Sequence, residues 1–212
     1  AGKSTIAKLI TRFHDPASGS VRIDGTDLRD VTLRSLRSQL GIVPQEPFLF
    51  HGTLRDNVGY GRPGASDDEL LAACEAVGLS DLVDRHDDGL DAAVHERGVS
   101  LSAGERQLLA LARSFLAGPR ILILDEATSN LDLESETRVE RALDTVLDGT
   151  TAVLIAHRLA TAMRADRIAV VDDGRIVELG PHDELVALGG RYAALHRAWI
   201  AAGGADRHDT TR

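Results

Sequence analysis

Residues 99–132 read VSLSAGERQLLALARSFLAGPRILILDEATSNLD, and this stretch decides the fold of the chain. Ser102 stands three residues before Glu105, a spacing typical of a capping box at the start of a helix. A broad apolar helical face follows, and Gly118 stands where such a helix would end. The next run, RILILDE at 120–126, is apolar and ends in two acids, as a buried strand of a parallel sheet does. Together these features predict an α/β fold.

The alternation of helix and strand continues on the C-terminal side of this stretch. Residues 134–147 have the pattern of an amphipathic helix, and TTAVLIAH at 150–157 is a second buried strand. DRIAVVDDGRIVELG at 166–180 predicts two strands joined by Asp-Asp-Gly, and two helical segments are expected near 181–199. Continuous apolar strands separated by helices indicate a mainly parallel sheet.

The N-terminal side predicts an interruption of this alternation. KSTIAKLITRF at 3–13 has a helical apolar face, and residues 46–118 read as mainly helical, with Ser66 and Glu69 spaced as a second capping box. We therefore expect an α/β core formed by 1–45 and 119–200. We expect a helical subdomain inserted at 46–118 and a flexible tail at 201–212.

Composition limits the classes of protein that remain. The chain has 212 residues, of which 43% are apolar and 27% charged, as in ordinary globular domains. The formal net charge of -9 gives no general reason to bind nucleic acid or an anionic membrane surface. Cys74, the one cysteine, excludes an internal disulfide, and its apolar neighbours predict a core position. No apolar run approaches the roughly 18 residues of a membrane span.

The first five residues, AGKST, have the chemistry of a phosphate site. A glycine lets backbone N–H groups approach phosphate oxygens, and the start of a helix adds partial positive charge. Lys3 would reach the β- and γ-phosphates of a nucleotide, and Ser4 would bind Mg²⁺. The acids that end RILILDE fit the same chemistry: Asp125 suits Mg²⁺, and Glu126 could polarise a water for attack on the γ-phosphate.

The order of these motifs closely resembles that of the nucleotide-binding domains of ATP-binding-cassette proteins, from Ala1 to about Ile200. The resemblance rests on six signals in order: Gly2-Lys3-Ser4-Thr5, Gln45, LSAGE at 101–105, ILILDE at 121–126, SNLD at 129–132, and His157. It implies a P-loop NTPase (RecA-like) core with a mainly parallel sheet and an inserted α-helical subdomain. It also implies an ATPase that uses Mg²⁺.

The resemblance assigns a role to each matching position. The nucleotide-binding residues it implies are Gly2, Lys3, Ser4, Thr5, Gln45, Asp125 and His157, and Mg²⁺ would be held by Ser4, Gln45 and Asp125. Glu126, His157 and Gln45 would be the catalytic residues. The signature motif (Ser102, Ala103, Gly104 and Glu105) would bind the γ-phosphate of ATP held by a second nucleotide-binding domain, identical or different. Asp132 would act across the interface between the two domains.

The signature motif departs from the common family form L-S-G-G-Q at two positions. Ala103 replaces a glycine and adds a methyl group where a phosphate approaches. Glu105 replaces a glutamine, so it can still cap the helix but adds negative charge beside the nucleotide. We expect a tolerated variant of the motif.

Two further segments, 43–63 and 95–107, resemble the exporter type, in which ATPase and membrane helices share one polypeptide. By resemblance, Phe48-Leu49-Phe50 and Glu96 would lie where a short helix of the membrane domain docks, although the apolar cluster could equally be core packing. Residues upstream of Ala1 are expected to supply the remaining loop glycines, an adenine-stacking aromatic residue and the membrane helices.

The expected function is therefore ATP-driven export at the cytoplasmic face of the cell membrane, without nucleic acid. Two alternatives remain open: a soluble cassette ATPase acting on nucleic acid or ribosomes, and a separate ATPase subunit of an importer. The distance from Gln45 to Ser102 is too short for a long coiled-coil insertion, which disfavours the first.

Overall fold

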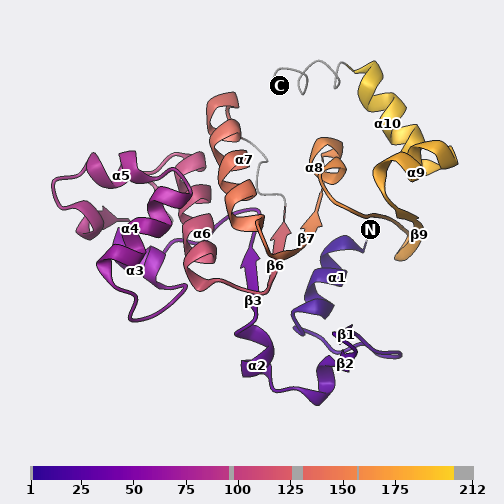
Figure 1. Cartoon of the computed structure of the whole chain (residues 1–212), viewed down its shortest axis with the longest axis horizontal. Coiled ribbons are helices and arrows are strands. Elements are labelled where there is room, and N and C mark those ends of the chain that lie inside the picture. The colour runs from indigo at the N-terminus through magenta and orange to yellow at the C-terminus, as the bar shows by residue number, and fades with distance from the viewer. Residues whose placement is uncertain (1, 96–97, 126–130, 157, 203–212) are drawn as a thin grey trace. The chain divides into compact units, whose positions relative to one another are not determined.

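The computed structural model describes residues 2–95, 98–125, 131–156 and 158–202 (Figure 1). The chain divides into two compact units, and each is described by itself. The first unit combines residues 1–21 with 154–212, and the second unit is the continuous segment 22–153. The sequence predicts a core at 1–45 and 119–200 and a separate helical subdomain at 46–118. These bounds differ from those of the two units, and the predicted division stays a prediction. Most of the predicted flexible tail, 203–212, lies outside the described residues.

The first unit contains a two-stranded sheet with helices on either side of it in the sequence. Strands β8 (Ile168–Asp172) and β9 (Arg175–Gly180) pair antiparallel, as the sequence predicts. They are preceded by α1 (Lys3–Ile10) and α8 (Leu159–Met163) and followed by α9 (His182–Leu188) and α10 (Arg191–Ala201). Ile168, Leu185 and Tyr192 form its buried cluster, so the closing helices are fixed to the sheet by apolar packing.

Helix α1 is shorter than its apolar pattern predicts. The pattern extends to Phe13, whereas the helix ends at Ile10. Arg12 has a positive φ of 52°, a backbone conformation that does not continue a right-handed helix. Phe13 is consequently 63% exposed instead of sharing the helical face.

The second unit contains a parallel strand pair. Strand β3 (Leu40–Val43) pairs with β6 (Ile121–Asp125) in a parallel register that sets Val43 opposite Leu124. The sheet continues to β7 (Thr151–Ile155), in the order β3-β6-β7. Residues 122–124 of β6 are all buried, which explains why this strand reads as a continuous apolar run.

The helices of the second unit gather around α6 (Ala103–Ala117). Helix α7 (Leu133–Leu147) packs along α6, and α3 (Leu54–Gly59) and α4 (Asp67–Ala76) contact it as well (Figure 1). Helix α5 (Ser80–Asp84) follows α4. Shorter elements complete the unit: β1 (Arg22–Ile23), β2 (Thr26–Asp27), η1 (Leu28–Asp30), α2 (Leu33–Arg37), β4 (Gly52–Thr53), η2 (Gly89–Asp91) and β5 (Ala93–Val94). Helices α3 to α6 all begin within the range 46–118 that was predicted to be mainly helical.

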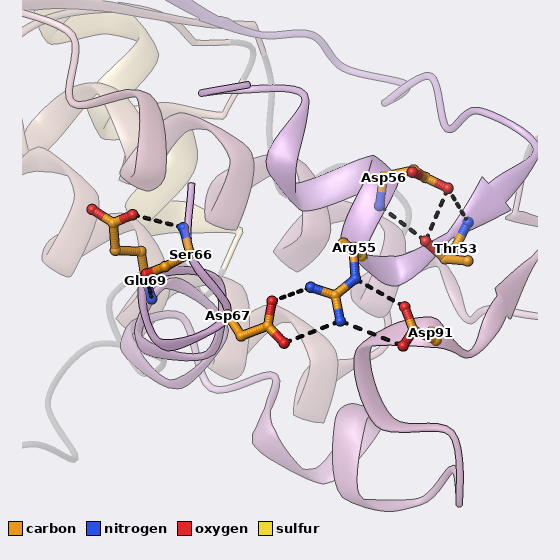
Figure 2. Close-up of polar contacts among 7 residues, drawn as sticks. All are labelled: Thr53, Arg55, Asp56, Ser66, Asp67, Glu69 and Asp91. Atoms are coloured by element: carbon orange, nitrogen blue, oxygen red, sulfur yellow. Dashed lines mark hydrogen bonds and ion pairs between the residues drawn. The ribbon is translucent and has the colours of Figure 1, made fainter. Parts of the chain in front are cut away.

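Capping boxes define where these helices begin. The predicted box at Ser66 and Glu69 is confirmed: the Ser66 N–H donates to Glu69 Oε2 at 2.8 Å, and the Glu69 N–H donates to Ser66 Oγ at 3.3 Å. Thr53 and Asp56 form a second box at the start of α3, with the Thr53 N–H 2.9 Å from Asp56 Oδ2 (Figure 2). Each box satisfies N–H groups that have no partner inside the helix.

Arg55 connects three elements of the second unit. Its guanidinium, on α3, donates to Asp67 in the first turn of α4 and to Asp91 at the end of η2, where Nε lies 2.8 Å from Oδ1 (Figure 2). The hydrogen bond from Arg55 lowers the pKa of Asp91. The guanidinium thus joins α3 to α4 and to η2 through hydrogen bonds between charged groups.

Candidate functional site

Helix α1 begins directly after a glycine with a left-handed backbone. Gly2 holds the N-cap position with φ of +114°, and a Cβ there would lie 3.3 Å from both Gly174 Cα and Val171 Cγ1. A residue with a side chain would therefore be strained and crowded. Gly2 also brings no side-chain acceptor to the first N–H groups of the helix. Ser4 and Thr5 are exposed in this first turn.

Lys3 is directed to the carboxyl end of β7. Its Nζ donates to the carbonyl oxygen of Ala156 at 2.7 Å, across 153 positions of sequence. The contact places a half-buried ammonium group beside the end of a strand and next to the helix start. His157, the predicted switch residue, follows Ala156 in sequence and lies outside the described residues.

Asp125 and Gln45 lie at one edge of the parallel sheet. Asp125 is the last residue of β6 and is half-buried, and Gln45 follows the end of β3 by two residues and is exposed. Because the register sets Val43 opposite Leu124, both side chains belong to the carboxyl ends of neighbouring strands. This is the edge at which parallel sheets bind ligands. Glu126 comes next in sequence and lies outside the described residues.

The predicted capping box of the signature motif is confirmed. Ser102 is the N-cap of α6, its N–H donates to Glu105 Oε2 at 2.8 Å, and the Glu105 N–H donates to Ser102 Oγ at 3.1 Å. Glu105 Oε1 accepts a hydrogen bond from Arg85 Nη2 at 2.6 Å. Burial raises the pKa of Glu105, but the hydrogen bonds from the Ser102 backbone and from Arg85 outweigh it and leave the pKa below its ordinary value. Glu105 is thus a paired carboxylate at neutral pH.

The middle of the signature motif packs against α7. Ala103 is exposed, whereas Gly104 is buried, and a Cβ on Gly104 would lie 2.8 Å from both Cβ and Oγ of Ser135. Asp132 is the N-cap of α7, where its Oδ1 accepts from the Ser135 N–H at 3.0 Å. Two motifs predicted to act at the same interface therefore meet through Ser135.

The apolar segment beside Gln45 divides between core and surface. Leu49 is fully buried, whereas Phe48 is 57% exposed. Phe48 and Phe50 make an edge contact with ring centroids 5.1 Å apart, and Phe50 lies 4.7 Å from the Tyr60 ring. Leu49 thus belongs to the core, whereas Phe48 and Phe50 belong to a partly exposed aromatic cluster, and docking of a membrane-domain helix there stays a prediction. Glu96, predicted to lie nearby, is outside the described residues.

Two arginines near these motifs were not identified from the sequence. Arg113, on α6, donates from Nε to the Asn57 carbonyl at 2.9 Å, and its guanidinium lies over the Phe50 and Tyr60 rings at 5.5 and 5.3 Å. Arg85 contacts Glu105 from 20 positions away. Neither has a local motif around it, since each contact depends on how separate helices pack. For Arg85, the signal in the sequence is Glu105, because a carboxylate in place of the common glutamine suggests a basic partner.

Neither a metal-binding cluster of side chains nor a membrane-spanning helix occurs among the described residues. No group of three or more His, Cys, Asp or Glu side chains in this part of the chain is arranged to hold a metal ion. Mg²⁺ binds oxygen ligands, and the Asp125 carboxylate, the Gln45 side-chain carbonyl and the Ser4 hydroxyl each carry an oxygen of that kind. None of the helices described has the length and apolarity to cross a membrane.

Comparison with known proteins identifies the family. The family model described as ABC transporter matches residues 1–129. The uncharacterized ABC transporter ATP-binding protein YknV of Bacillus subtilis is 52% identical over 198 residues, covering 93% of this chain and 33% of the relative. The ATP-dependent lipid A-core flippase of Thiobacillus denitrificans is 50% identical over 197 residues, covering 92% of this chain and 34% of the flippase.

A solved structure agrees with these relatives. A bacterial Atm1-family ABC exporter with ATP bound matches with a TM-score of 0.84 and 44% identity, over 93% of this chain and 35% of the exporter. The chain thus spans about a third of the length of the proteins it matches. The prediction made from the ordered motifs is confirmed: the chain belongs to the ABC transporter family, as an ATP-binding domain with the P-loop NTPase fold, similar to those of exporters.

Proposed function

We propose that this chain is the ATP-hydrolysing domain of an ABC exporter, in which ATP binding and hydrolysis drive a substrate across a membrane. The observation that carries the proposal is the parallel β3–β6 pair: Asp125 ends one strand and Gln45 follows the other, and ligands of parallel sheets commonly bind at such carboxyl ends. The match to an exporter structure over 93% of the chain supports it.

Within one domain, the described residues would bind and orient ATP with Mg²⁺. The Gly2 backbone and the first turn of α1 would approach the phosphate oxygens, and Lys3 would exchange its carbonyl partner for the β- and γ-phosphates. Ser4, Asp125 and Gln45 would hold Mg²⁺, which, when bound, neutralises charge on the phosphates.

Hydrolysis itself is proposed for residues at the ends of β6 and β7. The Glu126 carboxylate would accept a proton from a water whose oxygen attacks the γ-phosphorus, while the bond from that phosphorus to the ADP oxygen breaks. His157 would hold the γ-phosphate and orient the water. Gln45 would report the presence of ATP to the adjoining segment that contains Phe48.

A second nucleotide-binding domain would complete each site. The N-terminus of α6, with Ser102 at its cap, carries the partial positive charge that suits a phosphate. We propose that the signature motif binds the γ-phosphate of ATP held by the partner domain and that Asp132 faces the same interface. The direct contact of Gly104 with Ser135 supports a coupled response of the two motifs.

A membrane domain of the same polypeptide is the other proposed partner. Phe48, Phe50 and Tyr60, held by Arg113, form a partly exposed aromatic cluster that suits an apolar helix end. Docking there would place the domain at the cytoplasmic face of the cell membrane. The net charge of -9 does not favour the alternative of a nucleic-acid-directed ATPase.

Binding of ATP to two lysine variants tests the assignment of the phosphate site. Lys3→Ala should weaken Mg-ATP binding about tenfold to a hundredfold, the equivalent of about 1.5–3 kcal/mol for hydrogen bonds to charged groups. Lys8→Ala is the matched control, because Lys8 is exposed in the last turn of the same helix. Its effect should stay below about twofold. Equal affinities of wild type and Lys3→Ala, measured by titration of the full-length protein, would contradict the assignment.

A further inference from the structure

Glu105 is the feature of the signature motif that most needs explanation. The common family residue at this position is a neutral glutamine, whereas a carboxylate in the first turn of α6 cancels part of the positive charge that attracts a phosphate. The same carboxylate also takes part in the capping box, where it accepts from the Ser102 N–H at 2.8 Å. The negative charge therefore sits where the proposed γ-phosphate would approach.

Arg85 supplies the opposite charge from another element. It is the C-cap residue of α5, and its Nη2 lies 2.6 Å from Glu105 Oε1. With Ser102 bound to Oε2 and Arg85 to Oε1, both oxygens of the carboxylate are occupied. The Glu105 side chain is 11% exposed and that of Arg85 57%, so the carboxylate lies inward and the guanidinium spreads toward the surface.

Arg106, the neighbour of Glu105 in the sequence, is not the arginine that pairs with the Glu105 carboxylate. Arg106 follows Glu105 in α6, but its Nη1 donates to the Leu101 carbonyl at 2.6 Å, which fixes it to the loop before the helix. Among the described contacts, Arg85 makes the ion pair with Glu105. The pair has no net charge, so it presents the helix start with the charge of the common glutamine.

Given the proposed function, on which this inference rests, we propose that Arg85 is a positioning residue for the signature motif. By holding and neutralising Glu105, it keeps the start of α6 able to receive the terminal phosphate of ATP bound to the partner domain. Arg85 thus compensates for the acidic variant of the motif, and its importance should disappear when Glu105 is made neutral.

A double-mutant cycle tests this dependence through ATP hydrolysis by the full-length protein. Arg85→Gln should lower kcat/KM for ATP about threefold to tenfold, and Arg85→Lys should retain most of the activity because it keeps the charge. In a Glu105→Gln background, the same Arg85→Gln change should alter kcat/KM by less than about twofold. Thermal unfolding of each variant separates loss of charge compensation from loss of fold.

A matched control exists in α4. Arg62 pairs with Glu69 at 2.5 Å, and Glu69 is also the carboxylate of a capping box, but this helix is outside the signature motif. Arg62→Gln should leave kcat/KM within about twofold of wild type. An unchanged kcat/KM in Arg85→Gln, or an equal loss with and without Glu105, would overturn the inference. Failure of the proposed function would appear differently, as a wild-type protein that does not hydrolyse ATP.

Discussion

Single carboxylates at helix starts recur throughout the second unit. Asp56, Glu69 and Glu105 each accept a hydrogen bond from the N-cap N–H of α3, α4 and α6 respectively. The pKa of Asp56 and of Glu69 lies below its ordinary value, chiefly because these backbone N–H groups stabilise the ionised form. In Glu105 the same hydrogen bond, together with Arg85, outweighs the effect of burial.

These depressed pKa values predict a stability that falls in acid. A carboxyl group whose pKa is lower in the folded chain binds its proton more readily when unfolded, so its contribution is complete above the ordinary carboxyl pKa of about 4. The contribution is lost as the pH falls through the lowered value. We expect the free energy of unfolding, measured with urea, to decrease steadily below about pH 4.

Replacing one carboxylate provides the control for this prediction. Glu69→Gln keeps an oxygen that can accept from the Ser66 N–H but removes the titrating group. The variant should therefore lose less stability than wild type between neutral and acid pH. An identical pH profile for both proteins would contradict the link between the capping boxes and acid sensitivity.

Close contact between α6 and α7 is the main feature at the scale of elements. A methyl group on Gly104 would meet the Ser135 side chain at 2.8 Å, so the two helix starts approach each other only because residue 104 is a glycine. Gly104→Ala should destabilise the protein by about 1–3 kcal/mol through overpacking, measured by urea unfolding. Ser135→Gly removes both crowded atoms and should make Gly104→Ala much less costly in the double variant.

A second helical glycine controls for the effect of alanine itself. Gly59, in α3, would place a Cβ 3.6 Å from Leu70 Cδ2, an ordinary van der Waals distance. Gly59→Ala should be neutral or stabilising by up to about 1 kcal/mol, because alanine favours helix. If Gly104→Ala behaved in the same way, the proposed tight packing between α6 and α7 would be wrong.

Elements with strong local signals could be predicted from the sequence. The Ser102–Glu105 box and Gly118, with its left-handed backbone, bound α6 as expected, and the Asp-Asp-Gly turn joins β8 to β9. Cys74 is buried as predicted, and burial raises the pKa of its thiol to about 11. In each case the residues that determine the structure are neighbours in sequence.

Contacts between distant elements could not be predicted in this way. Phe115 belongs to the apolar pattern of α6 but is 38% exposed. The helical period of apolar residues indicates which of them share a face, but it does not indicate which other elements cover that face. Arg55 joins Asp67 and Asp91, and Arg85 reaches Glu105, only after several helices have packed. The same holds for the candidate site. The order of the motifs predicted its residues, whereas the contact by which Arg85 neutralises the charge of Glu105 is seen only in the folded chain.

At the scale of the whole molecule, the residues proposed for the activity are widely separated along the sequence. Lys3 and the start of α1 belong to the first unit, and Asp125, Gln45 and the signature motif belong to the second. ATP would thus be bound and hydrolysed by groups that are far apart in sequence. The central claim is that this machinery hydrolyses ATP, with Glu126 as the residue that activates water.

The most direct test compares hydrolysis with binding in the Glu126→Gln variant of the full-length protein. Loss of a general base should lower the rate of ATP hydrolysis by about 10²-fold or more, while a glutamine of similar shape should leave Mg-ATP binding nearly unchanged. The account predicts a variant that binds ATP and does not turn it over. Normal turnover by Glu126→Gln, or a wild-type protein that neither binds nor hydrolyses ATP, would contradict it.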